Sequence, residues 1–161
     1  TGSYIWRTGI RYDGEFKNGL PHGKGATTHP NGDRYEGEFK NGDKHGQGTD
    51  TFSSGASYIG ERKDGERNGR GTFSFSDGEN YVGEFKDSEQ HGKGTLILAD
   101  GQKYIGEFKN DEYHGKGTLS WPDGENYVGE WENGEMHGKG TYTYPNGDKT
   151  IGVWANDNLI E

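Results

Sequence analysis

The sequence predicts an all-β protein, an elongated, twisted, single-layer antiparallel sheet built from tandem 23-residue β-hairpins. One observation is a Tyr-x-Gly-Glu motif that recurs every 23 residues without a slip. A second is that short stretches of alternating apolar and polar residues are bounded by glycine-rich turns, which is typical of β-strands. A third is composition: 25% of the residues are hydrophobic and 31 are glycine, too little aliphatic mass for a large closed core. The motif begins at Tyr12, Tyr35, Tyr58, Tyr81, Tyr104 and Tyr127.

Each repeat predicts two strands in a fixed order. The first covers Tyr-x-Gly-Glu-Phe, and the second follows a Gly-x-Gly step, as in Gly94–Leu98. Asn-Gly and Asp-Gly steps supply residues that accept a positive φ in tight turns. Because short turns make sequential strands neighbours, we expect one open meander without helices. These steps start at Asn18, Asn31, Asn41, Asn68, Asn133 and Asn146, and at Asp64, Asp77, Asp100 and Asp123.

The chain is expected to form a single repeat array over residues 1–161. It opens and closes within a repeat, which favours a fragment of a longer array or of a larger protein. The partial repeats are 1–11 and 150–161, and the full repeats are 12–34, 35–57, 58–80, 81–103, 104–126 and 127–149.

Aromatic residues supply the predicted core. The chain contains ten Tyr, seven Phe and four Trp, which favours an ordered fold despite the low hydropathy. Tyr12, Gly14 and Phe16 lie on one side of their strand, and Gly14 leaves room for neighbouring rings to cross the backbone. Stacked repeats would therefore form a linear aromatic core without a second layer.

The segment YEGEFKNGDKHGQG, at Tyr35–Gly48, resembles the repeat of the MORN family (membrane occupation and recognition nexus), and six phased copies cover the chain. The resemblance implies an elongated, twisted single-layer sheet that serves as a scaffold. Four positions depart from the pattern: Arg62 replaces an aromatic residue, Asn68 replaces His, and Ser88 and Asp111 replace the turn glycine. We expect local irregularity in the repeat that contains Arg62 and Asn68.

Three patterns could suggest chemistry, and each has a structural interpretation. Equivalent histidines of the His-Gly steps stand roughly 10 Å apart, too far to share a metal ion. The glutamates of the motif form a column that we interpret as a solvated ladder opposed by lysines such as Lys17 and Lys40. The HGKGT segments at His91 and His114 lead into a strand, unlike a phosphate-binding loop. We therefore expect no enzyme activity, no metal and no cofactor.

Two positions of the second strand change along the chain, from polar in the early full repeats to aromatic or aliphatic in the later ones. The residue after the motif tyrosine changes similarly, from Asp13 and Glu36 to residues such as Ile105 and Val128. Ordinary sheet packing could explain the change, and the functional alternative is an apolar groove for a helical or extended segment of a protein partner. The candidate partner-binding residues are Phe52, Phe73, Phe75, Leu96, Leu98, Leu119, Trp121, Tyr142 and Tyr144.

Two other functions are alternatives. Lys93, Lys116 and Lys139 could form a basic edge for phosphoinositide headgroups or a membrane surface. The repeats could also be an accessory or regulatory segment of a larger enzyme. The net charge of −9 disfavours nucleic acid as a partner. The absence of cysteine fits a cytoplasmic location, in which membrane or cytoskeletal association is possible.

An open meander leaves two edge strands, and exposed edges invite pairing with another chain. The N-terminal edge, near Tyr4 to Arg7, and the C-terminal edge, near Thr150 to Trp154, are apolar. We therefore predict end-to-end self-association through these edges, unless the segment after Trp154 folds over the second one.

Overall fold

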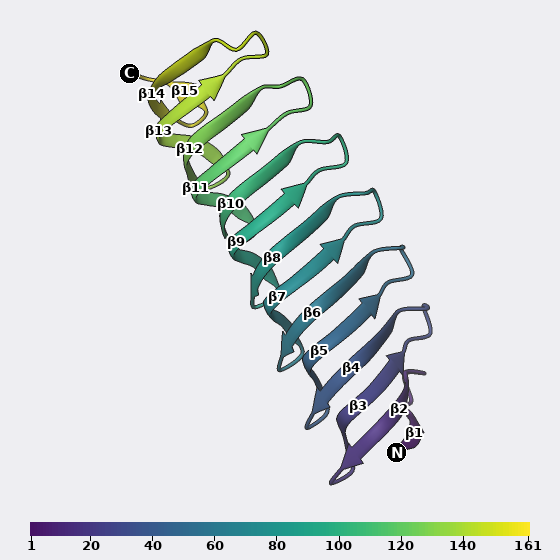
Figure 1. The fold of residues 1–161 in the computed structure, drawn as a ribbon. Helices are drawn as coiled ribbons and strands as arrows, with labels where there is room; N and C mark the ends of the chain where they lie inside the picture. Colours follow the sequence, from purple (N-terminus) through teal and green to yellow (C-terminus); the bar gives the residue numbers. More distant parts are fainter. The chain divides into compact units, whose positions relative to one another are not determined.

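The structure is a computed structural model that describes residues 1–161. It confirms the all-β prediction: the chain has no helix, and its fifteen strands form one open antiparallel sheet in sequential order (Figure 1). The strands are β1 (Gly2–Ile5), β2 (Arg11–Lys17), β3 (Leu20–Thr28), β4 (Arg34–Lys40), β5 (Asp43–Thr51), β6 (Ser57–Lys63), β7 (Glu66–Ser74), β8 (Asn80–Lys86), β9 (Glu89–Ile97), β10 (Lys103–Lys109), β11 (Glu112–Ser120), β12 (Asn126–Glu132), β13 (Glu135–Thr143), β14 (Lys149–Ala155) and β15 (Asn158–Leu159).

The residues group into two units. The N-terminal unit comprises Thr1–Ser76 with Phe85–Ser88, and the C-terminal unit comprises Asp77–Glu84 with Glu89–Glu161. In both units, hairpins pair a seven-residue strand with a nine-residue strand, as β4 does with β5 and β10 does with β11.

Two kinds of turn connect the strands. The turn inside a hairpin has two residues with positive φ, as at Asn41 (53°) and Gly42 (98°), so the Asn-Gly prediction holds there. The turn between hairpins has positive φ only at its glycine, and the preceding Asn31 accepts the Asp33 N–H through its side chain. The prediction of a turn at Asn68 is wrong, because Asn68 lies within β7, where the next glycine forms part of a bulge.

A tyrosine ring lies over a cross-strand glycine pair in each full repeat. In the second repeat, Gly37 pairs with Gly48, and a Cβ atom on Gly48 would lie 2.3 Å from the Tyr35 hydroxyl oxygen. The Tyr35 hydroxyl donates a hydrogen bond to the Glu38 carbonyl oxygen at 2.9 Å. The predicted role of the motif glycine is thus confirmed, although the ring that crosses it belongs to the same repeat.

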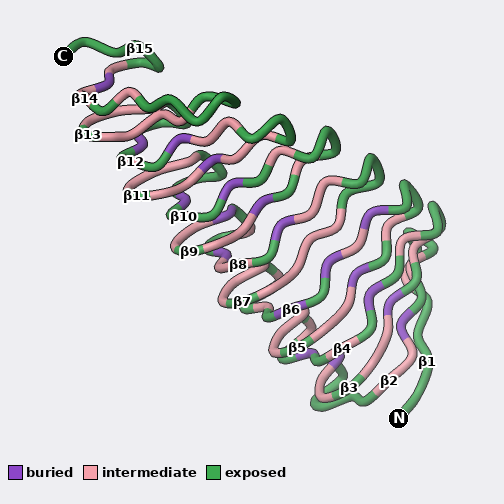
Figure 2. The backbone as a smooth tube through the Cα atoms, turned by 45° about the horizontal axis from the view of Figure 1, so that its top comes forward, coloured by how far each residue is buried: buried purple, intermediate pink, exposed green.

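The tyrosines form the core of each unit, and Figure 2 shows the buried segments recurring on successive strands. Tyr104 contacts Phe108 of its own repeat and Trp131 of the next repeat, both edge-on, with ring centroids 5.0 and 5.4 Å apart. The tyrosine side is called the aromatic face below, and the opposite side the open face. The fully buried rings are Tyr12, Tyr35, Tyr58, Tyr81, Tyr104 and Tyr127.

The motif glutamates are part of a β-bulge. Behind Gly37 the register shifts, and Gly46 takes a left-handed conformation with φ of 61°. The Glu38 carboxylate lies against Gly46 and accepts the Gln47 backbone N–H at 3.0 Å. The structure therefore corrects the interpretation of a ladder opposed by Lys17 and Lys40: on β3 the residue opposite Glu38 is Lys24, and the Glu38 carboxylate also satisfies a backbone donor that the bulge removes from the strand ladder.

Residues that replace the turn glycine form hydrogen bonds to the preceding repeat. The Asp111 carboxylate accepts the Gln90 N–H at 2.7 Å, and the Asp111 N–H donates to the Gln90 carbonyl oxygen at 3.1 Å. Ser88 makes the same pair of bonds with Arg67. Both residues have positive φ, so the added bond offsets the conformational cost of a side chain at this position.

The two sheet edges differ. At the C-terminal edge, β15 pairs with the end of β14, and the Val153 N–H donates to the Glu161 carbonyl oxygen. At the N-terminal edge, β1 pairs with β2 on one side only and is exposed along its whole length. The segment after Trp154 thus covers the C-terminal edge, which was the exception to the predicted association through both edges, and the prediction stays untested for β1.

Candidate partner-binding surface

The predicted partner-binding residues lie on the aromatic face, because their registers match those of the tyrosines: Tyr58 pairs with Phe73, and Tyr127 pairs with both Leu119 and Tyr142. They differ in exposure. Leu119, like Leu96, is only 7% exposed because it packs beside the tyrosine column. Phe52, Phe73, Leu98, Trp121 and Tyr142 are partly buried, and Phe75 and Tyr144 are 37% and 41% exposed.

The six aromatic candidates gather in two clusters. In the N-terminal unit, the first ring cluster consists of Phe52, Phe73 and Phe75, with centroids 6.0 and 4.4 Å from that of Phe73. In the C-terminal unit, the second ring cluster consists of Trp121, Tyr142 and Tyr144, with centroids 5.9 and 5.0 Å from that of Tyr142. The sequence prediction thus names two sets of side chains that are in contact.

Cations of the N-terminal unit pack on its own rings. The Lys44 ammonium lies 4.6 Å from the Tyr35 ring centroid, and the Arg67 guanidinium lies 4.9 Å from that of Phe73. Arg62 lies over both Tyr35 and Tyr58, at 5.7 and 5.2 Å. Such contacts are favourable because the ring face carries negative potential. The strands of this repeat keep the lengths and the register of the other repeats, so the expected irregularity is absent from the backbone, and at Arg62 a guanidinium takes the place of an aromatic ring.

A buried carboxylate completes this arrangement. The Asp50 side chain is 4% exposed and binds Lys44 at 2.6 Å and Arg62 through its other oxygen. Sequence analysis missed this cluster, although Asp50 and Arg62 are both charged at positions that are apolar in other repeats. Two opposite charges at such positions in adjacent repeats are the signal from which the ion pair could have been predicted.

Carboxylates lie near two tyrosine rings of the C-terminal unit, Tyr142 and Tyr113. The Tyr142 hydroxyl donates to Glu125 at 2.7 Å, and burial together with Glu125 and Asp123 raises the pKa of Tyr142 to about 12. Tyr113 stacks on Tyr104 at 3.9 Å, and burial, Glu79 and Asp100 raise its pKa. Burial also raises the pKa of Glu79. Sequence analysis missed Tyr113 and these carboxylates, since their approach to the rings depends on the fold of the turns.

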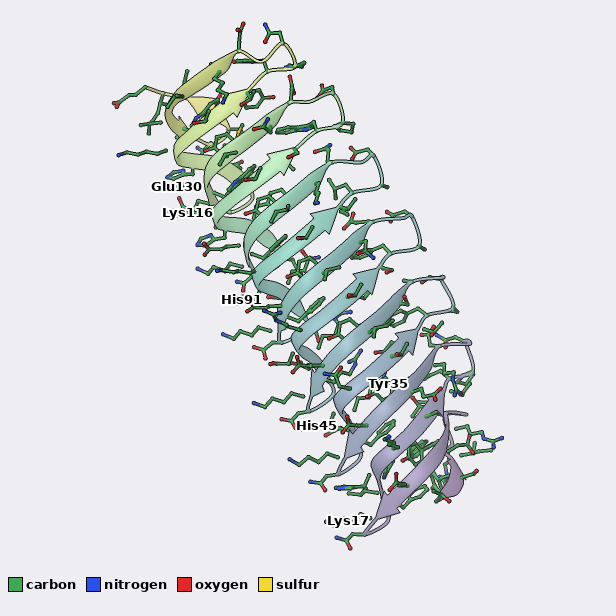
Figure 3. All side chains as sticks on the ribbon, in the orientation of Figure 1. Lys17, Tyr35, His45, His91, Lys116 and Glu130 are labelled. Carbon is green, nitrogen blue, oxygen red and sulfur yellow. The ribbon has the colours of Figure 1, made fainter.

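The open face carries the predicted basic residues. Lys93, Lys116 and Lys139 are exposed, and their partners across the strands are Glu107, Glu130 and Val153. Figure 3 labels Lys116 and Glu130, which come from adjacent strands. Two of the three lysines are thus matched by a glutamate, which reduces the positive potential of this edge. Beside them, Ile105 and Val128 are each 50% exposed.

The histidines of the His-Gly steps lie in the strands. His45 Nδ1 accepts the Asp64 N–H at 3.4 Å, and His22 Nδ1 accepts the Asn41 N–H at the same distance, so both bridge to the next repeat.

The structure contains no helix that could span a membrane.

Comparisons with known proteins bear on both family and fold. The MORN repeat sequence pattern matches residues 12–34, 35–57, 58–79, 81–103, 104–125 and 127–149. No curated protein matches the sequence.

Among solved structures, the fold is similar to the SAS-4 (dCPAP) TCP domain of Drosophila melanogaster in complex with a proline-rich motif of Ana2 (dSTIL). The TM-score is 0.54 at 13% identity, over 92% of this chain and 81% of that one. It is also similar to the TCP10 domain of Danio rerio CPAP in complex with a peptide of STIL. There the TM-score is 0.54 at 14% identity, over 99% of this chain and 71% of that one. At these identities the likeness concerns the fold.

Proposed function

Since the chain belongs to the MORN-repeat family, we propose that it is a non-catalytic scaffold whose aromatic face binds an extended segment of a protein partner. The observation that carries this proposal is the exposure of rings beside a complete core. The tyrosine column is already fully buried, yet Phe75 and Tyr144 keep 37% and 41% of their surface in solvent. Exposed aromatic side chains are typical anchors of protein interfaces.

Spacing favours an extended partner over a helical one. Two strands per repeat, about 4.8 Å apart, give a repeat spacing of about 9.6 Å. A polyproline II segment advances about 9.3 Å per three residues, so every third side chain meets an equivalent position of the next repeat. Two turns of an α-helix advance about 10.8 Å and lose this match within a few repeats.

The solved relatives of this fold support the same class of function. Both TCP domains are complexes with a peptide, and one of these peptides is a proline-rich motif. We extend peptide binding to this chain as part of the proposal.

The test is selection from a displayed library of random peptides about 12 residues long, which span roughly 37 Å when extended as polyproline II. Selected peptides are then titrated against Trp121→Ala, Phe75→Ala and the open-face control Ile105→Ala. We expect Trp121→Ala or Phe75→Ala to weaken binding about tenfold, as loss of an aromatic anchor does, and Ile105→Ala to change it less than about twofold. Peptides that respond only to Ile105→Ala, or a selection that yields no binder, would refute the proposal.

A further inference from the structure

The two ring clusters occupy equivalent positions in different repeats. Phe52, Phe73 and Phe75 of the N-terminal unit correspond, three repeats later, to Trp121, Tyr142 and Tyr144 of the C-terminal unit. Both sets have the same contacts, since the central ring lies between the other two in each case. The two clusters can therefore be compared position by position.

Charged groups beside the clusters are opposite in sign. Arg67 lies over the first cluster, and the corresponding residue of the second is Met136. Conversely, Asp123 and Glu125 beside the second cluster correspond to Ser54 and Ala56 beside the first. The first cluster thus has its own cation and lacks these carboxylates, whereas the second has carboxylates and an apolar residue in the place of the arginine.

The same asymmetry extends over the two units. The N-terminal unit has twelve lysines and arginines and eleven aspartates and glutamates, a net charge of +1, whereas the C-terminal unit has six and sixteen, a net charge of −10. All six cations of the C-terminal unit are lysines at open-face registers, each next to a residue of the aromatic face: Lys93, Lys103, Lys109, Lys116, Lys139 and Lys149.

We propose that the partner segment bound by the C-terminal unit is basic, and that one of its arginine or lysine side chains lies over the second ring cluster and pairs with Glu125 and Asp123. This inference rests on the proposed function and specifies the chemistry of the partner.

The second cluster offers two interactions to a cation of the partner. The first cluster makes one of them with a cation of its own chain and lacks the other. The Tyr144 ring is accessible, and a guanidinium over an aromatic ring is stabilised by the ring quadrupole. Glu125, within 2.7 Å of the Tyr142 hydroxyl, is held beside the rings and offers a charge-assisted hydrogen bond.

The experiment compares three labelled peptides of the form (Arg-Pro-Pro) repeated about four times, in which the arginines are kept, replaced by glutamine or replaced by glutamate. Fluorescence anisotropy with the whole chain gives the affinities at low and high salt. We expect the glutamine peptide to bind about tenfold more weakly than the arginine peptide, the glutamate peptide more weakly still, and the difference to shrink at high salt.

Variants with matched controls locate the site. Glu125→Gln should weaken the arginine peptide about fivefold, whereas Glu132→Gln, which removes the same charge from the open face beside His137, should change it less than about twofold. Met136→Arg supplies the second cluster with the cation of the first and should weaken binding about tenfold, while Thr118→Arg on the open face should not.

Each outcome separates the two proposals. If the glutamine peptide binds as tightly as the arginine peptide, or Glu132→Gln acts as strongly as Glu125→Gln, the inference of a basic partner is overturned and peptide binding stands. If none of the three peptides binds while library-selected peptides still respond to Trp121→Ala, the basic inference again fails alone. If the library also yields nothing, the scaffold proposal fails, and this inference with it.

Discussion

The charged cluster in the core of the N-terminal unit can be tested with two single variants and the double variant. Asp50 and Arg62 are 4% and 8% exposed, and they occupy positions that are Leu96 and Phe108 beside Tyr104. Replacing both residues, as Asp50→Leu with Arg62→Phe, should convert this site into the apolar arrangement of the later repeats. Replacing only one should leave a buried charge without its partner.

The magnitudes follow from the contacts. Arg62→Phe leaves Asp50 with one remaining ion pair, to Lys44 at 2.6 Å, and should cost about 2 kcal/mol. Asp50→Leu leaves a buried guanidinium whose remaining hydrogen bond is to the Gly65 carbonyl oxygen, and should cost about 3 kcal/mol. The double variant removes both charges, and Lys44, 27% exposed, can turn to solvent. We expect its stability to lie within about 1 kcal/mol of that of the parent, because apolar replacement of a buried ion pair is often neutral.

Urea unfolding followed by circular dichroism measures the four proteins. With a urea dependence of about 2 kcal/mol per M, a cost of 3 kcal/mol lowers the midpoint by about 1.5 M. Because repeat arrays can unfold in parts, hydrogen exchange of the amides in β5 and β6 provides a local readout. Additive losses of about 5 kcal/mol in the double variant would refute the reasoning, since the pair would then stabilise the fold beyond mutual neutralisation.

Three further predictions concern other parts of the chain. Burial raises the pKa of Tyr35 and Tyr58 to about 12, so their contribution to stability is complete below the unfolded value of about 10 and is lost as pH rises toward 12. Thermal melts and phenolate absorbance should show unfolding in that pH window. Ionisation of these tyrosines near pH 10 in a protein that stays folded would contradict the prediction. Asp111→Ala should cost about 1.5 kcal/mol through its lost bond to Gln90, whereas Asp111→Gly should cost less than about 0.5 because glycine relieves the positive φ; equal losses in urea melts would disprove this. We expect concentration-dependent sedimentation through β1 that Ile5→Lys abolishes, unless the parent is monomeric at every concentration.

The sequence was sufficient for the strands because one signal, the spacing of tyrosine and glycine, determines both the alternation and the turns. It also named the residues of both ring clusters among the candidate partner-binding residues, but not their grouping into two clusters. It did not reveal the bulge, since the same glutamate pattern is expected whether the Glu38 carboxylate packs against Gly46 or belongs to a solvent-exposed ladder. Nor did it reveal the contact of Asp50 with Arg62, because that contact joins neighbouring repeats across the aromatic face. Contacts between repeats form where side chains of two repeats lie on the same face of the sheet. At positions that vary from repeat to repeat, the periodicity does not predict which contacts form.

The edge-on ring packing also has a consequence for how such a chain can change its length over generations. Tyr104 contacts one ring from its own repeat and one from the next, and Tyr127 has the same neighbours in Trp131 and Trp154. Duplicating or deleting one whole period by unequal recombination leaves each tyrosine between a side chain of its own repeat and one of the next, with Arg62 in the place of a ring beside Tyr35 and Tyr58. Gaining or losing a few residues within a strand would instead turn the following rings away from their tyrosines. The number of repeats can therefore change, whereas the packing of the rings constrains the length of each repeat to 23 residues.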